Sequence, residues 1–343
     1  MTEITLTKPD DWHLHVRDGR VLADVVPMTA ARFGRAIIMP NLKPPITTVA
    51  AALEYRQRIL AAVPPQRSFE PLMTLYLTDN TPPAEIANAS QNPFVHAVKL
   101  YPSGATTNSD FGVTRMEKVY DTLAAMEEYD LPLLIHGEAT GSDVDVFDRE
   151  KAFIERVFAP LVGRFPKLRM VFEHITTQDA VEFVLACDEH VAATITPQHL
   201  LFNRNALFKG GINPHFYCLP VLKREIHREA IVQAAVSGDN KFFLGTDSAP
   251  HAKNAKESAC GCAGIFSAHA ALELYATAFE QVGKLDKLEA FASHFGADFY
   301  RLPRNTDTVT LVKQQWDIPW EYPFGEQTIV PLLGGEKITW YLK

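Results

Sequence analysis

Residues 11–17 read Asp-Trp-His-Leu-His-Val-Arg, a short apolar run with two histidines two positions apart. In a β-strand, residues i and i+2 project to the same face, so His13 and His15 can both reach one metal ion. Arg17 continues this alternation and places a positive charge beside them. The run therefore predicts a strand that carries a metal pair suited to a hydrolase acting on an anion, provided that further ligands lie nearby.

Seven more short apolar runs follow, and most of them end in polar or turn-forming residues. Continuous apolar character with β-branched residues is typical of parallel strands buried on both faces. Helical stretches lie between the runs, at 50–63, 115–129, 148–158, 177–189 and 224–237. The eight predicted strands are 11–16, 35–40, 71–77, 96–101, 131–136, 169–174, 191–196 and 241–246.

Eight strands alternating with helices predict a (β/α)8 TIM-like barrel, with an open doubly wound sheet as the alternative. No Gly-x-Gly-x-x-Gly follows a strand, which removes the main support for a dinucleotide fold. We expect residues 1–343 to form one domain. Within it, residues 304–343, which are rich in tryptophan and proline, form a short C-terminal tail that wraps the barrel, with a final strand at 337–342.

Composition limits the classes of partner. The chain has 343 residues, 47% of them hydrophobic, and a formal net charge of −8, which argues against binding to nucleic acid or an anionic membrane. No apolar run is long enough to span a bilayer, and the first residues lack the pattern of a signal peptide. Four cysteines without a secretion signal indicate reduced thiols and a cytoplasmic protein. Cys260 and Cys262 are interpreted as residues of a close-packed loop.

The carboxyl ends of the predicted strands carry residues that bind metals or anions. Because chemistry in a barrel takes place at these ends, six strands that each deliver such a residue to one rim predict a joint site. Each residue alone has a structural alternative: a core histidine, a capping aspartate, a turn asparagine or a strand-end lysine. His199 is interpreted as structural or as supporting a ligand. The residues at the rim are His13, His15, Asn41, Lys99, His136, His174, Asp247 and His251.

This order of ligands resembles the amidohydrolase superfamily, with His-x-His on the first strand, Lys on the fourth, His on the fifth and sixth, and Asp on the eighth. The resemblance extends over the whole chain and narrows to the dihydroorotase family, in its shorter bacterial and fungal single-function type. The motifs that carry it include DDWHLHVRDG (10–19), RAIIMPNLKPP (35–45), LLIHGE (133–138), VFEHIT (171–176) and FLGTDSAPH (243–251).

The resemblance implies a site with two divalent metal ions, with Zn²⁺ as the expected metal. Lys99 would be carboxylated on its ε-amine, because a carbamate can bridge two cations and an ammonium cannot. Since carbamate formation needs the neutral amine, we expect nearby cations to depress the pKa of Lys99. One ion would take His13, His15 and Asp247, and the other His136 and His174. A metal-bridging hydroxide would be the nucleophile, with Asp247 as the proton shuttle.

The implied reaction is the reversible hydrolysis of the cyclic amide of (S)-dihydroorotate to N-carbamoyl-L-aspartate, in pyrimidine biosynthesis. Arg17, Asn41 and His251 would hold the substrate carboxylate, and backbone groups of Leu219 and Ala263 would line the pyrimidine pocket. Residues 103–110 would form a lid that closes with Thr106 and Thr107. Glu138 and Glu173 are candidate partners of ligand histidines, although strand alternation places Glu173 on the face opposite His174. A homodimer is also implied.

Three alternatives remain at this stage. Another cyclic amidase, such as a hydantoinase or allantoinase, is the nearest, although we expect no flanking β-sandwich here. A one-metal deaminase would not need a bridging Lys99. A catalytically silent barrel, kept as a structural subunit, would be marked by a substituted ligand position, and every such position is filled.

Overall fold

A computed structural model describes residues 2–343, and at its centre eight parallel strands pair in chain order. All eight predicted runs form strands. All eight strands end before the predicted carboxyl limit, because the residues there already belong to loops. The strands are β2 (Asp11–Leu14), β3 (Arg35–Ile38), β4 (Glu70–Tyr76), β5 (Val95–Leu100), β6 (Leu133–Ile135), β7 (Met170–Phe172), β8 (Val191–Ile195) and β9 (Phe242–Leu244).

The first strand of this sheet meets the segment that follows the last one. Leu14 forms a parallel bridge with Ser248, and the Asp247 N–H donates to the His13 carbonyl at 2.9 Å. The buried carboxylate of Asp11 accepts from the Thr246 N–H at 2.9 Å and from its hydroxyl at 2.6 Å. These contacts confirm the predicted (β/α)8 barrel, and the open doubly wound sheet is wrong.

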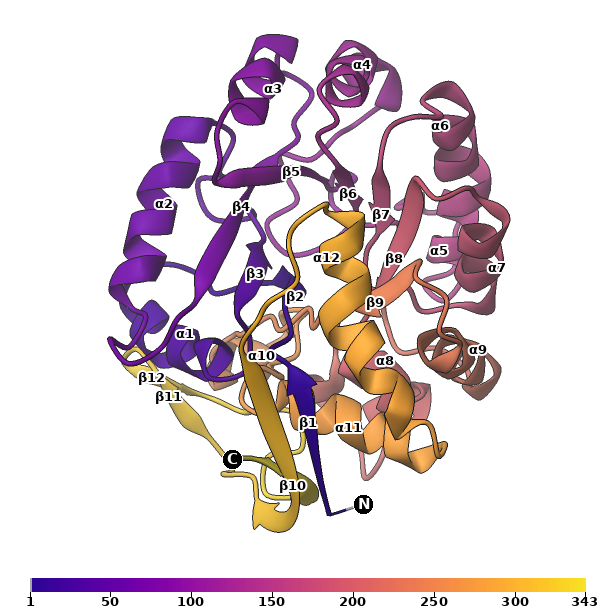
Figure 1. Ribbon diagram of the computed structural model, residues 1–343. Helices are drawn as coiled ribbons and strands as arrows, with labels where there is room; N and C mark the ends of the chain where they lie inside the picture. Colours follow the sequence, from indigo (N-terminus) through magenta and orange to yellow (C-terminus); the bar gives the residue numbers. More distant parts are fainter. Residues whose placement is uncertain (1) are drawn as a thin grey trace.

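Helices surround the barrel (Figure 1). Thr48 and Thr177 begin two of them, each accepting a hydrogen bond from the N–H three residues ahead. The predicted helix 148–158 widens into a π-helical turn, Ile154–Phe158, which ends two residues before Pro160, a residue with no N–H to continue the ladder. The α-helices are α1 (Leu22–Ala30), α2 (Val49–Ala61), α3 (Pro83–Ser90), α4 (Tyr120–Glu128), α5 (Arg149–Phe153), α6 (Ala159–Arg164), α7 (Gln178–Ala186), α8 (Pro197–Leu201), α9 (Glu225–Val236), α10 (Lys253–Lys256), α11 (Ala271–Gln281) and α12 (Phe295–Phe299).

Apolar side chains fill the inside of the barrel below the strand ends that carry the polar residues. Trp12 stacks on Tyr300 with ring centroids 4.5 Å apart, and Phe243 packs edge-on against both. Tyr300 follows α12, which lies across the barrel in Figure 1 and closes its amino end. Because this end is packed with apolar side chains, any polar site must lie at the other end.

The C-terminal segment contains a sheet of its own. Strands β10 (Thr308–Asp317) and β13 (Lys337–Leu342) pair antiparallel, which confirms the predicted final strand, and β11 (Tyr322–Phe324) and β12 (Gln327–Ile329) form a hairpin. The N-terminal strand β1 (Glu3–Thr7) adds to β10, beside which it lies in Figure 1. We did not predict β1, because its pairing partner lies about 300 residues away in sequence and leaves no local signal.

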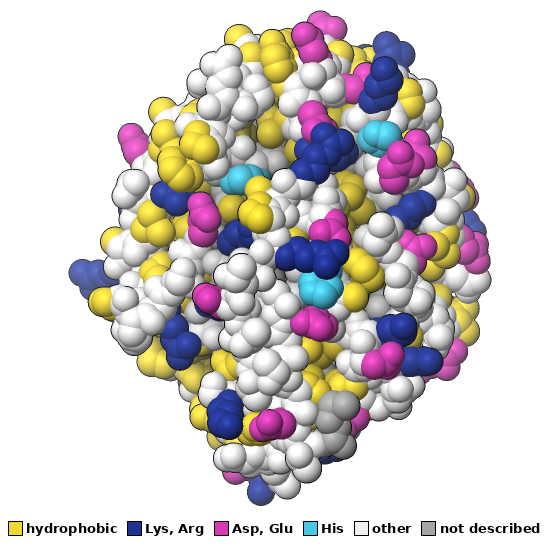
Figure 2. Space-filling model, in the orientation of Figure 1, with side chains coloured by type: hydrophobic (Ala, Val, Ile, Leu, Met, Phe, Trp, Pro, Cys, Tyr) yellow, Lys and Arg dark blue, Asp and Glu magenta, His cyan; other side chains and the backbone are white. Residues whose placement is uncertain are grey.

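The surface does not concentrate one sign of charge on the face shown in Figure 2, where basic and acidic side chains are interspersed. Across residues 2–343, every helix is too short or too polar to cross a bilayer.

The contact between Gly296 and Trp12 yields a prediction on stability. A Cβ at Gly296 would overlap the Trp12 indole, so Gly296→Ala is expected to lower the free energy of unfolding by about 1–3 kcal/mol. Gly163, in exposed helix α6, meets no side chain within 4 Å in the described chain, so Gly163→Ala should instead raise stability by about 0.5–1 kcal/mol. Urea unfolding of both variants measures this, and equal effects would contradict the packing described here.

Candidate active site

A cavity opens at the carboxyl ends of the strands. The predicted site residues reach it from β2, β3, β6, β7 and β9, from the loop after β5 and from the loops around 219 and 263. Of the predicted set, Lys99 lies beneath the cavity and His251 lines the adjoining outer cavity, and the others line the cavity itself. These are His13, His15, Arg17, Asn41, Thr106, Thr107, His136, His174, Leu219, Asp247 and Ala263.

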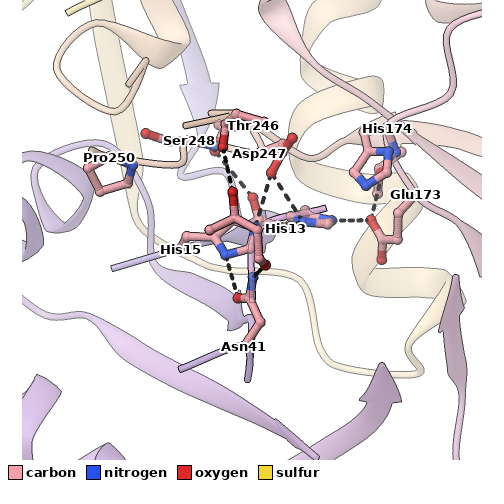
Figure 3. A network of polar contacts seen from close by, with 12 residues as sticks. His13, His15, Asn41, Glu173, His174, Thr246, Asp247, Ser248 and Pro250 are labelled. Carbon is pink, nitrogen blue, oxygen red and sulfur yellow. Dashed lines mark hydrogen bonds and ion pairs between the residues drawn. The ribbon is translucent and has the colours of Figure 1, made fainter. Parts of the chain in front are cut away.

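Three buried groups converge on one side of this cavity (Figure 3). The Nε2 atoms of His13 and His15 lie 3.3 Å apart, and Asp247 Oδ1 lies 3.4 Å from the first and 3.1 Å from the second. Together these residues form a candidate group for holding a metal ion. The barrel closure brings them together, because His13 and His15 belong to β2 and its end, and Asp247 follows β9.

Hydrogen bonds on the far side of each ring determine which nitrogen faces the cavity. His13 Nδ1 donates to Glu173 Oε2 at 2.7 Å, and His15 Nδ1 donates to Asn41 Oδ1 at 2.9 Å. Both Nε2 atoms therefore present lone pairs to each other and to a carboxylate oxygen. Three converging acceptors repel one another unless a cation lies between them, so these residues fit a divalent metal ion.

His136 and His174 form the other side of the site, with ring centroids 4.8 Å apart. His136 Nε2 donates to Glu138 Oε2 at 2.7 Å, which leaves its Nδ1 free toward the cavity. His174 Nδ1 and Lys99 Nζ are both buried and have no hydrogen-bond partner among residues 2–343. Unsatisfied buried donors and acceptors are costly, so this side also fits a bound cation and a modified lysine.

Burial controls the protonation of these groups. It lowers the pKa of His15 and of His174 well below the usual range, with further lowering by Arg17 and His136 respectively, so both rings are neutral and able to bind metal. Burial also lowers the pKa of Lys99 to about 8, while Glu173 and Asp247 act in the opposite direction. Desolvation, and not a neighbouring cationic side chain, is therefore the source of this lowering within the chain itself, and the expected effect of bound cations stays a prediction.

Glu173 supports a ligand histidine other than its neighbour. Strand alternation placed Glu173 and His174 on opposite faces, but β7 ends at Phe172 and His174 has a φ of +44°. Glu173 reaches across the barrel to His13 and also accepts from the Thr194 hydroxyl at 2.6 Å. Asp247 has the same φ of +44°. Two non-glycine residues held in this left-handed region indicate backbone strain at the site.

Arg17 reaches the cavity from a loop and not by continuing the strand alternation. Strand β2 ends at Leu14, and Arg17 has a φ of +60°. Its guanidinium donates to the Pro250 carbonyl at 2.8 Å and to His251 Nε2 at 2.9 Å. Burial, followed by Arg17, lowers the pKa of His251 to about 2, so its neutral ring can accept this bond. The two residues thus form one unit at the mouth of the cavity.

The loop at 103–110 lies over the cavity and is bonded to two other rim segments. Asn41 Nδ2 donates to the Thr107 carbonyl at 3.1 Å, and Asn108 Nδ2 donates back to the Asn41 carbonyl at 2.9 Å. On the other side, the Thr107 hydroxyl donates to the Ala263 carbonyl at 3.3 Å. Asn41 therefore joins His15 to this loop, a role that the sequence did not suggest.

Tyr101 lines the cavity and was missed from the sequence. Its ring is 1% exposed, and its hydroxyl has no hydrogen-bond partner in the described part of the chain. It lies two residues after Lys99, where alternation puts both side chains on one face, and that spacing could have revealed it. An aromatic residue at a strand end is more often a core residue, which is why the spacing alone was not decisive.

His199 has the contacts expected of a structural or supporting residue, whereas the loop of Cys260 and Cys262 is not close-packed as expected, because Cys260 is exposed and Cys262 only half-buried. His199 is buried, lies 2.7 Å from the Thr196 hydroxyl through Nδ1 and donates to the Pro220 carbonyl at 3.1 Å through Nε2. Cys260 and Cys262 lie in a loop with their sulfur atoms 3.9 Å apart. All four cysteines lie within the described residues and are free thiols.

Comparison with known proteins agrees with this geometry. Residues 10–321 match the model of the amidohydrolase family. A dihydroorotase from Acaryochloris marina is 66% identical over 340 residues, which cover 99% of each chain. The crystal structure of dihydroorotase from Saccharomyces cerevisiae in complex with 5-fluoroorotic acid is 34% identical, with a TM-score of 0.92 over 100% of this chain and 99% of that chain.

The nearest alternative class shares the fold alone. The L-hydantoinase (dihydropyrimidinase) from Arthrobacter aurescens is 16% identical, with a TM-score of 0.80 over 99% of this chain and 83% of that chain. The sequence identity to this hydantoinase is far below the 66% full-length identity to a dihydroorotase. The chain therefore belongs to the amidohydrolase family, and within that family to the dihydroorotases.

Proposed function

We propose that this enzyme catalyses the reversible hydrolysis of the cyclic amide of (S)-dihydroorotate to N-carbamoyl-L-aspartate. The observation that supports it best is the convergence of His13 Nε2, His15 Nε2 and Asp247 Oδ1 beside a cavity that also holds Arg17. A site for a divalent cation next to a guanidinium suits a substrate that carries both an amide carbonyl and a carboxylate.

Two sets of residues would hold two divalent ions, which we propose to be Zn²⁺. His13, His15 and Asp247 form the first set, and His136 and His174 the second, with the carboxylated Lys99 between them. Bound there, the ions would polarise the amide carbonyl and supply a hydroxide at neutral pH. The unpartnered Nζ of Lys99 and its lowered pKa support carboxylation, since only the neutral amine reacts with CO2.

Side chains of the protein transfer the proton, bind the substrate and exclude water. Asp247 takes the proton from the attacking water and returns it to the ring nitrogen that leaves; burial raises the pKa of this carboxyl, which favours uptake of the proton. Arg17 and His251, with Asn41, hold the substrate carboxylate. Backbone groups of Leu219 and Ala263 line the ring pocket, and Thr106 and Thr107 exclude water when the loop at 103–110 lies over the site.

Two further properties belong to this proposal. We infer a homodimer from the family resemblance. We also infer a cytoplasmic location, which the four free thiols support, since they suit a reducing compartment.

Substrate choice is the most direct test. The purified protein is expected to hydrolyse L-dihydroorotate, followed as loss of ring absorbance, and to leave hydantoin and allantoin unchanged. The reverse reaction should be seen with N-carbamoyl-L-aspartate at lower pH. Removal of the metal with a chelator should abolish both directions, and Zn²⁺ should restore them. Turnover of hydantoin but not dihydroorotate, by protein containing two metal ions, would contradict the proposal.

Lys99→Ala tests the bridging lysine. Loss of the carbamate removes two anionic oxygens, so metal content is expected to fall below two ions per chain and activity by at least about 10³-fold. Metal analysis and the dihydroorotate assay measure this, with exposed Lys167→Ala, at the amino end of the barrel, as the control. Labelling with ¹³C-bicarbonate should give a carbamate signal in the native protein only. Full metal content and activity in Lys99→Ala would refute the bridging role.

Tyr101→Phe tests the buried hydroxyl in the cavity. Because this hydroxyl has no partner within residues 2–343, we expect its removal to leave stability unchanged or higher while kcat falls about 10- to 100-fold. Tyr300→Phe is the matched control, since its hydroxyl is equally buried and unpartnered in the described chain but lies at the amino end of the barrel. Equal kcat values in the two variants would remove Tyr101 from the reaction.

A further inference from the structure

Lys256 is a buried cation outside the set of residues used above. It is the last residue of α10 and is 3% exposed. Its ammonium donates to three backbone carbonyls, those of Tyr217 at 2.7 Å, Cys262 at 2.9 Å and Gly264 at 2.7 Å. Burial lowers the pKa of Lys256 to about 8, so the group still carries its charge at neutral pH. All three of its donors are used, which makes this a fully satisfied buried ammonium.

These carbonyls belong to two chain segments that line the cavity. Cys262 and Gly264 flank Ala263, and Tyr217 lies two residues before Leu219. The Gly264 N–H also donates to the Tyr217 carbonyl at 3.0 Å, so the two segments are joined directly as well as through the lysine. One ammonium therefore fixes the relative position of two neighbouring backbone segments that line the cavity.

Ala263 is also where the loop at 103–110 attaches. Its carbonyl accepts from the Thr107 hydroxyl at 3.3 Å and lies 3.0 Å from His251 Nε2. Gly264 has a φ of +151°, and a Cβ there would lie 2.5 Å from the Ala249 carbonyl oxygen, so the segment has little freedom to move toward the barrel. Lys256 restrains the segment further through the Cys262 and Gly264 carbonyls.

We propose that Lys256 is a positioning residue that holds Ala263 and Leu219 at the separation that the substrate ring requires and keeps the Ala263 carbonyl in place to receive the loop at 103–110. The inference rests on the proposed function for the identity of the substrate, and on the three hydrogen bonds for the positioning. Charge-assisted bonds to carbonyls are stronger than neutral ones, and their loss leaves three carbonyls without a donor.

The test compares two buried lysines. Lys256→Met keeps the length of the side chain and removes the donors, and it is expected to raise KM for dihydroorotate about 10- to 100-fold with a smaller fall in kcat and no loss of metal. Lys8→Met is the control, because Lys8 is also buried and donates to a carbonyl, that of Ser68, at the amino end of the barrel. It should lower stability without changing KM.

The segment that contains Ala263 also contains two cysteines whose reactivity reports on its position. Cys260 is exposed and Cys262 half-buried, one residue from Ala263. In the native enzyme, iodoacetamide is expected to alkylate Cys260 faster than Cys262. In Lys256→Met the segment around Ala263 loses its restraint, so the rate of alkylation at Cys262, measured by mass spectrometry, should rise several-fold. Lys8→Met should leave that rate unchanged. This readout needs no substrate, so it tests the positioning even if the native enzyme does not act on dihydroorotate, in which case the proposed function fails instead.

An unchanged KM, or an unchanged alkylation rate at Cys262, in folded Lys256→Met would overturn the inference. If that variant does not fold, Lys256→Arg takes its place. A planar guanidinium keeps the charge but cannot match an ammonium that donates in three directions, so the same two changes are expected at smaller size. A Lys256→Arg enzyme with native KM and native thiol reactivity would equally refute the positioning role.

Discussion

The closure of the barrel is the constraint on which the site depends. Strand β2 pairs with the segment after β9 through the bridge between Leu14 and Ser248, and Asp11 ties the same seam to Thr246. This seam places His13 and His15 against Asp247, although more than 230 residues separate them in the chain. Without it, the two histidines would have no carboxylate beside them, and the candidate group for a metal ion would be incomplete.

Three of the candidate ligand histidines are held by a polar partner, which for His13 and His15 comes from another strand or loop. Glu173 orients His13, Asn41 orients His15, and Glu138 orients His136. These bonds hold the rings in the neutral tautomers that direct lone pairs inward, which is the arrangement that a metal needs and that water would not maintain. Asn41 also donates to the Thr107 carbonyl in the loop at 103–110. A movement of that loop would therefore change the support of the His15 ring.

The two ends of the barrel differ in their side chains and in their backbone conformations. At the amino end, Trp12, Phe243 and Tyr300 pack under α12 and provide a rigid apolar floor. At the carboxyl end, His174 and Asp247 adopt left-handed backbone conformations that a strand would not support. A well-packed floor can maintain such strain at the rim, because the strands below it cannot relax to relieve it.

The sequence by itself determined the eight strands, their order and the residue types at their carboxyl ends, because apolar runs and strand periodicity are local properties. The same is true of the helix start at Thr177, whose capping bond spans three residues. Only the tertiary structure decided the pairing of β1 with β10, the bond from Glu173 to His13, the approach of Arg17 from a loop and the contacts of Lys256. Each of these joins residues distant in sequence or depends on a φ angle that alternation cannot describe. The sequence therefore specified which chemical groups the site contains, and the closed barrel decided which atoms of those groups face one another.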